Sequence, residues 1–284
     1  PIVRLARPLR FRALDPAAAD TVSLRLEGLC ITRVDPEAPA WPLIARAAVD
    51  RLEVLGCTLD PGGWRDHAGD RMPMGAGMEL RVPYGFGGAE ADAFDETPDI
   101  VVQRSVTGAL RIDRGYTLRL TDSIVDAGRG VGDDPDDAFA LTGASDPIDG
   151  WGPPTRVHGI TAFGRVRVET IDGRGGIWVH ALEVLNDQRG CIRYSYFSGA
   201  GDRLPQNIGC ITGATLRFVS EVFGEPAYAQ LAHTTDARVR ERGPGDNAMG
   251  AFGFLQEAHK WRNIQIRFRE FMPVGVRPLL IPVT

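Results

Sequence analysis

The stretch Leu118-Arg119-Leu120-Thr121-Asp122-Ser123 alternates apolar and polar side chains, which is the pattern of a half-buried β-strand. A second apolar pair, Ile124-Val125, follows the small polar corner Asp122-Ser123. The sequence therefore predicts a short strand, a corner and another short strand. The same alternation recurs at residues 24–28, 52–57, 100–105 and 166–169, and a similar corner closes the second and third of these segments.

The recurrence of the corner predicts coils that stack in parallel. None of these segments contains the Asn-Gly or Asp-Gly pair of a tight antiparallel hairpin. Ser105 and Ser123 occupy equivalent places in two of these segments, and Cys30 and Cys57 occupy roughly equivalent places in two others. The two separations along the sequence give a lower and an upper bound for the number of residues in one coil. An antiparallel β-sandwich would also show short alternating strands, but its corners would not recur in phase. A solenoid buries its apolar side chains against neighbouring coils and needs about three of them, which these segments supply.

We therefore predict an all-β solenoid, a right-handed single-stranded parallel β-helix with a small α-helical C-terminal segment. A lead-in covers residues 1–21 and the β-helix covers residues 22–218. Residues 61–97 and 127–154 are predicted to be loop insertions that emerge on one face, and this face is the expected contact surface.

Residues 219–284 are predicted to form a helical segment that caps the last coil or docks on a partner. One short helix is expected within residues 226–242, with an Asp at its start and a Gly-Pro stop after it. A second is expected over residues 251–262, which residues 263–271 either extend or follow as a strand. The apolar tail, residues 277–284, is expected to pack on the solenoid or to join a partner.

Composition and charge exclude several classes of protein. The formal net charge of -5 provides no basic field for a phosphate backbone, so nucleic-acid binding is not expected. No apolar run approaches the roughly 18 residues of a membrane span, and the opening residues lack a signal peptide. We expect a cytoplasmic protein or part of a released particle, although the first residue, Pro1, leaves a longer natural chain open. No cofactor motif is present, so no cofactor is predicted.

The four cysteines do not form a disulfide framework. Cys30 and Cys57 lie in strand patterns and are expected to pack as small apolar groups. Cys191 and Cys210 lie in a loop-rich stretch. A disulfide between them would add very roughly 3 kcal/mol of stability, whereas a cytosolic location would keep both thiols reduced.

Carboxylates supply the candidate chemistry. Asp122 and Asp126 lie on adjacent corners, where a polysaccharide lyase or hydrolase would group its acids. Aspartates at corners also accept hydrogen bonds from the backbone of the turn, and this structural interpretation is favoured. Four aspartates carry enough oxygen atoms for Ca²⁺ but lack the spacing of a calcium loop, which favours a solvated loop. They are Asp133, Asp134, Asp136 and Asp137.

Basic and aromatic residues gather near the end of the chain, as they do at protein interfaces. A helix packed on the solenoid would carry the same residues, so both readings stay open. The predicted interface residues are Trp261, Arg262, Arg267, Phe268, Arg269 and Phe271.

Six blocks of the sequence resemble a group of uncharacterised bacterial β-helix proteins associated with gene clusters for phage-tail-like contractile injection particles. The blocks are residues 55–62, 102–108, 120–127, 189–196, 226–231 and 247–252. The resemblance implies a non-enzymatic baseplate, fibre or spike component that assembles with other protein subunits, as an oligomer. The alternatives are a pectin-lyase-like β-helix that binds or cleaves a surface glycan, and an adhesin domain of a larger secreted protein.

Overall fold

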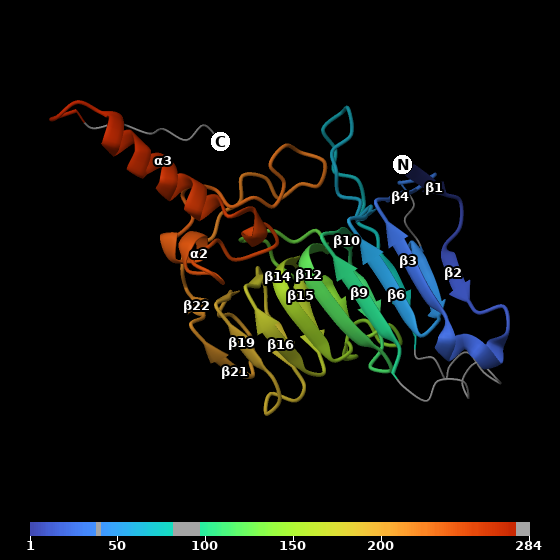
Figure 1. Ribbon diagram of the computed structural model, residues 1–284. Coiled ribbons are helices and arrows are strands. Elements are labelled where there is room, and N and C mark those ends of the chain that lie inside the picture. Colours follow the sequence, from blue (N-terminus) through green and yellow to red (C-terminus); the bar gives the residue numbers. More distant parts are fainter. Residues whose placement is uncertain (38–40, 82–96, 277–284) are drawn as a thin grey trace.

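The computed structural model describes residues 1–37, 41–81 and 97–276, and the regular structure of these residues is mostly β-strand, arranged in two sheets (Figure 1). Within these residues, every pairing between two named strands is parallel. Parallel sheets and a short C-terminal helix are compatible with the predicted β-helix and exclude the antiparallel sandwich.

The first sheet contains two sets of strands that meet along a bend. Its strands are β1 (Ile2–Leu5), β3 (Ser23–Glu27), β4 (Cys30–Arg33), β6 (Arg51–Leu55), β7 (Thr58–Leu59), β9 (Asp99–Gln103), β10 (Val106–Gly108), β12 (Thr117–Asp126), β14 (Thr155–Phe163), β16 (Ile171–Arg174), β17 (Ile177–Trp178), β19 (Cys191–Arg193), β20 (Tyr196–Phe197), β21 (Gln206–Ile208) and β22 (Ile211–Thr212). The long strands β12 and β14 cross the bend and belong to both sets.

The second sheet closes the other side of the β body, the name used here for the two sheets together. Its strands are β2 (Leu9–Arg12), β5 (Ile44–Ala48), β8 (Met78–Leu80), β11 (Leu110–Ile112), β13 (Phe139–Thr142), β15 (Arg165–Val168) and β18 (Leu182–Val184). The chain passes from the first sheet around the bend, then to the second sheet and back. One such passage is called a coil below.

A residue in the left-handed conformation occupies the bend in each successive coil. Five of these residues are glycine, which adopts a positive φ without steric cost, and three are not. They are Gly28, Gly56, Arg104, Asp122, Gly159, Gly175, Tyr194 and Gly209, with φ between 46° and 73°. The predicted corner is therefore confirmed as a backbone feature.

A ladder of Ser and Cys side chains follows the bend from coil to coil. The Ser105 hydroxyl accepts a hydrogen bond of 3.0 Å from the backbone N–H of Cys57. The Ser123 hydroxyl accepts one of 3.2 Å from the N–H of Ser105 in the same way. The Cys57 thiol accepts one of 3.4 Å from the N–H of Leu29. These side chains satisfy buried backbone donors that the strand ladders leave unpaired at the bend.

The alternating apolar residues of the sequence line the interior of the β body. In the register of the first sheet, Leu52 pairs with Ile100, and Ile100 pairs with Leu118. All three side chains are almost completely buried. The core is thus a stack of similar side chains, one from each coil, and the residues between them face outward.

Two strands lie where the sequence predicted loop insertions. β8 lies within residues 61–97 and β13 lies within residues 127–154, so the insertions are shorter than expected; residues 82–96 lie outside the described part. β13 escaped prediction because all four of its residues are buried and none alternates with a polar side chain.

The C-terminal helices differ in extent from the prediction. α2 (Ala237–Glu241) is capped by Asp236 and ends before Gly243, but residues 226–235 are not helical. α3 (Glu257–Phe271) starts six residues later than expected and continues as one helix through residue 271. Two 3₁₀ helices, η1 (Pro16–Thr21) and η3 (Gly253–Leu255), complete the elements. No helix in the described ranges is long and apolar enough to cross a membrane, and residues 277–284 lie outside those ranges.

Candidate functional surfaces

Asp126, one of the two candidate catalytic residues, is buried inside a junction between segments. Its carboxylate accepts hydrogen bonds of 2.6 Å from the Tyr228 hydroxyl and of 2.6 Å from the backbone N–H of Gly128. Burial raises the pKa of Asp126, and these two hydrogen bonds partly oppose the rise. The side chain is only 1% exposed, and its hydrogen bond with Tyr228 connects the segment around Tyr228 to the end of β12.

Asp122, the other candidate, lies at the bend, beside His158 and Arg104 rather than beside Asp126. Partial burial raises its pKa, and the charges of His158 and Arg104 oppose that rise. The structure therefore does not bring the two carboxylates together in the way that an acid and base pair requires.

Three segments meet above the end of β12: residues 61–75, 127–137 and 219–231. The Met74 side chain packs against Gly128, which places the first two segments side by side as predicted. Glu221 accepts hydrogen bonds of 3.2 and 3.3 Å from the N–H of Val131. Burial raises the pKa of Glu221, and the hydrogen bond from Val131 opposes the rise. Sequence reasoning missed the third segment because its polar contacts join residues about a hundred positions apart.

The aspartates of the acidic loop interact with other groups of the same loop. Asp133 accepts a hydrogen bond of 2.8 Å from the N–H of Gly130, and Asp136 forms an ion pair of 3.2 Å with Arg129. Across the described ranges, no group of three or more His, Cys, Asp or Glu residues is placed to hold a metal ion. The calcium candidates Asp133, Asp134, Asp136 and Asp137 thus gain no support.

Cys191 and Cys210 are free thiols, which corrects the disulfide alternative. Cys191 begins β19, where its register partner is Gln206. Cys210 lies four residues beyond Gln206, around the bend, and is the next member of the ladder after Ser195. The register holds the two cysteines out of alignment, and a disulfide requires Cα atoms within about 7 Å.

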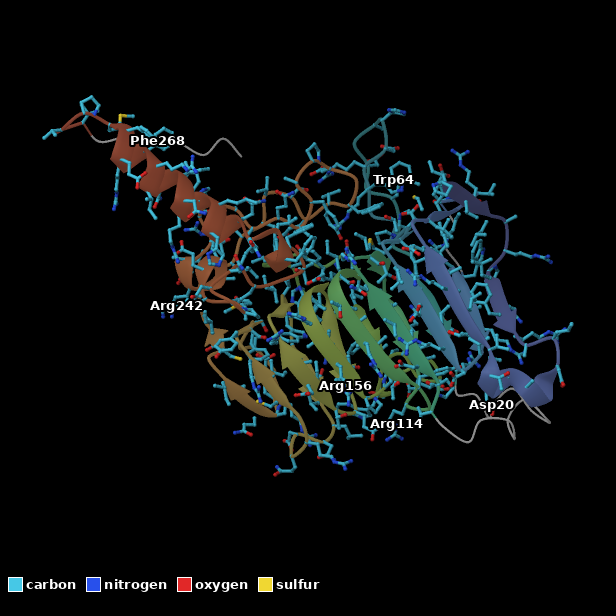
Figure 2. The ribbon with its side chains drawn as sticks, viewed as in Figure 1. Asp20, Trp64, Arg114, Arg156, Arg242 and Phe268 are labelled. Carbon is cyan, nitrogen blue, oxygen red and sulfur yellow. The ribbon has the colours of Figure 1, made fainter. Side chains whose placement is uncertain are left out.

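The predicted interface residues all lie on α3, which extends away from the sheets (Figures 1 and 2). None of its fifteen residues is buried. Ile264 is 43% exposed and Phe271 is 81% exposed. An apolar helix face with this exposure is unusual in a monomer, because apolar side chains are normally covered.

The root of α3 is held to the rest of the molecule. The Trp261 ring packs against the ring of His233 with centroids 5.1 Å apart, and the His259 ring is hydrogen-bonded to the Gly245 carbonyl at 2.9 Å. Beyond Trp261, the apolar residues continue at Ile264, Phe268 and Phe271. This spacing of three, four and three residues forms one stripe along the helix, called the α3 stripe below.

Basic side chains cover part of the outward face of the first sheet, a feature that the sequence analysis did not detect. Arg119 pairs in register with Arg156, and in the next row His158 pairs with Arg174, which pairs with Arg193. All five side chains are exposed. Their separation in the sequence concealed them, since only the register of the coils brings them together.

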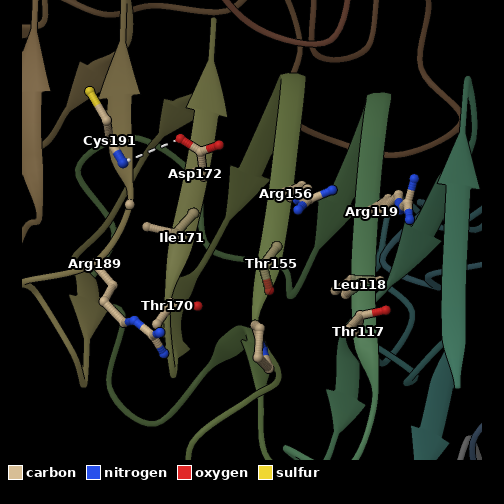
Figure 3. A pocket seen from close by; sticks show the side chains of 12 residues that line it. Thr117, Leu118, Arg119, Thr155, Arg156, Thr170, Ile171, Asp172, Arg189 and Cys191 are labelled. Atoms are coloured by element: carbon tan, nitrogen blue, oxygen red, sulfur yellow. Dashed lines mark hydrogen bonds between the residues drawn. The ribbon is translucent and has the colours of Figure 1, made fainter. Parts of the chain in front are cut away.

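A groove of about 480 Å³ runs across this basic face (Figure 3). Arg119, Arg156 and Arg189 line it together with Asp172, which accepts a hydrogen bond of 3.3 Å from the N–H of Cys191. Three threonines, Thr117, Thr155 and Thr170, also line the groove. The groove thus combines cations, hydroxyl groups and one carboxylate.

Comparisons with protein-family models, with curated proteins and with solved structures found no match to this chain.

Proposed function

We propose that this chain is a right-handed parallel β-helix that serves as a non-enzymatic structural subunit and docks on a larger protein assembly through α3. The observation that carries the proposal is the α3 stripe. It begins where Trp261 contacts the body and continues through exposed Ile264 and half-buried Phe268 to exposed Phe271. Such a helix face is the form in which amphipathic helices bind a hydrophobic partner surface.

Several features support a rigid spacer. Parallel pairing of the named strands, a left-handed residue at each bend and polar side chains that bond the backbone at several bends are what stacked coils require. Parallel strands joined by crossovers within one sheet are nearly always right-handed, which is the basis of the proposed handedness. A body of this kind holds α3 at a fixed place relative to its sheets.

The charges of α3 favour a partner of opposite charge. The helix carries four basic and two acidic side chains, although the whole chain has a net charge of -5. Lys260 and Arg267 border the α3 stripe on one side. Two antiparallel copies of the helix would bring these cations together, which is destabilising. The proposed partner is therefore an acidic amphipathic helix or groove of another protein, rather than a second copy of this chain.

The resemblance of the sequence provides the candidate assembly, a phage-tail-like contractile particle in which the chain is a baseplate, fibre or spike component. The glycan-cleaving alternative has less support, because buried Asp126 is bonded to Tyr228 and stands apart from Asp122.

The test is co-assembly with the tube, sheath and baseplate subunits of such a particle. The chain would be co-expressed with them, the particles collected by sedimentation, and the amount of bound chain measured by mass spectrometry. We expect the wild-type chain to sediment with the particles and the Ile264→Ser, Phe268→Ser, Phe271→Ser triple variant to remain in the supernatant.

A matched control is available on the same helix. Ile266 is 47% exposed but lies on the opposite side from the α3 stripe, so Ile266→Ser should sediment like the wild type. Because none of the substituted residues is buried, circular dichroism should show the same fold for all variants. Sedimentation of the triple variant at the wild-type level, or failure of the wild type to sediment, would reject the proposal.

A further inference from the structure

We infer that the basic face of the first sheet binds an acidic polysaccharide, with the chain of uronate sugars lying across the strands in the groove of Figure 3. This inference is independent of the proposed docking through α3. It rests on the register of the arginines, on the lining of the groove and on the distribution of charge along the sheet.

The arginines of this face lie opposite one another on neighbouring strands. Arg119 and Arg156 are register partners, and so are Arg174 and Arg193, so neighbouring guanidinium groups start from strands only about 4.8 Å apart. Like charges directly opposite each other destabilise a sheet. Asp172, the register partner of Arg156 on its other side, offsets part of the repulsion between Arg119 and Arg156, and an anionic ligand over the two arginines would remove the rest.

At the other end of the sheet, arginines on the outward face are neutralised by neighbouring glutamates. There, Arg25 forms an ion pair of 2.8 Å with Glu27, and Arg51 forms one of 2.8 Å with Glu53. In the groove, Arg119 retains a longer contact of 3.4 Å to Asp99. Within the described residues, Arg156, Arg174 and Arg189 form no ion pair. On this outward face, the arginines without an ion pair thus lie over the later coils.

The groove matches a uronate polymer better than a nucleic acid. The guanidinium groups present paired N–H donors that fit a carboxylate, and the hydroxyl of Thr170 and the carboxylate of Asp172 can bond sugar hydroxyls. None of the twelve lining residues is aromatic, so the groove has no platform on which bases could stack. The strand spacing of about 4.8 Å is also of the order of one hexose unit, so successive carboxylates can meet Arg119 and Arg156 on neighbouring strands.

Binding would be measured by isothermal titration calorimetry with oligogalacturonate and oligomannuronate as probes, at low salt and at 0.15 M salt. We expect both salt conditions to show binding, with weaker binding at the higher salt because exposed charges are screened. Arg156→Gln and Arg189→Gln should each reduce the affinity by about tenfold, as expected for loss of a charged hydrogen bond, because both side chains line the groove.

Arg25→Gln is the matched control, because Arg25 lies on the same outward row as Arg156 but four coils away. It should leave the affinity unchanged. Methyl-esterified oligogalacturonate, which lacks the charges, should not bind. The inference is overturned if the wild type binds neither uronate, if Arg25→Gln weakens binding as much as Arg156→Gln, or if single-stranded DNA of equal charge binds as tightly.

Discussion

The Tyr228 hydroxyl donates a hydrogen bond of 2.6 Å to Oδ2 of Asp126, a residue 102 positions earlier in the chain. This contact joins the segment that follows the last coil to the end of β12. Asp126 is buried and Tyr228 is half-buried, and each influences the ionisation of the other. Burial raises the pKa of Tyr228 well above 10, and the neighbouring Asp126 carboxylate raises it further.

Tyr228→Phe should lower the free energy of unfolding by about 1–3 kcal/mol, because buried Asp126 loses a charged hydrogen bond. Urea denaturation at pH 7 measures this. Tyr194→Phe is the control, since Tyr194 is 44% exposed and lies on the surface. Equal stability of Tyr228→Phe and the wild type would show that the contact contributes nothing.

Asp126→Asn should make the stability less dependent on pH. Because the folded pKa of Asp126 is raised above its ordinary value of 3.8, the native state binds more protons than the unfolded state just above that value. The contribution of Asp126 to stability is therefore complete below 3.8 and declines as the pH rises through the folded pKa. Asparagine cannot ionise, so the decline should be shallower in urea titrations across this range. Parallel curves for variant and wild type would contradict the assignment.

Ser105→Ala should lower the free energy of unfolding by about 1–3 kcal/mol, because the buried N–H of Cys57 loses its acceptor. Ser105→Cys should restore part of the loss, since a thiol fills the equivalent place at Cys57. Thermal or urea unfolding distinguishes the two variants. An alanine variant as stable as the wild type would mean that the ladder is not a source of stability.

Gly56→Ala tests the bend itself. Gly56 has a φ of 58° and an added Cβ would meet no atom within 4 Å, so only backbone strain opposes the substitution. We expect a loss of about 1–2 kcal/mol. Gly56→Asn should lose less, because asparagine tolerates the left-handed region. If side-chain bulk, rather than φ, decided the cost, Gly56→Asn would lose at least as much stability as Gly56→Ala.

The sequence was sufficient for features that repeat from coil to coil. Ser105 and Ser123 are indeed equivalent, since Val106 and Ile124 are register partners. The pairing of Cys30 with Cys57 was wrong by one residue: Cys30 pairs with Thr58, and Leu29 occupies the place of Cys57. Alternating apolar and polar residues identify a strand and the two faces of its side chains. They do not show how many residues separate two strands, so the pairing register of the strands cannot be derived from the pattern.

Contacts that do not repeat could not be predicted. The burial of Asp126 depends on Tyr228, and neither residue has a local pattern that identifies the other. The basic face depends on the register of Arg119 with Arg156, which lie on strands separated by the acidic loop and β13. The exposed character of α3 was equally hidden, because the same residues would form a helix packed on the body.

The most direct test of docking through α3 is a photo-cross-linking measurement in assembled particles. A photoreactive phenylalanine analogue would replace Phe268 in one chain and Ile266 in another, and cross-linked peptides would be identified by mass spectrometry. Docking through the α3 stripe predicts a cross-link from position 268 to an acidic segment of a tube, sheath or baseplate subunit, and none from position 266. Particles that contain the chain but show no such link from position 268, or a link only to residues of the same chain, would contradict it.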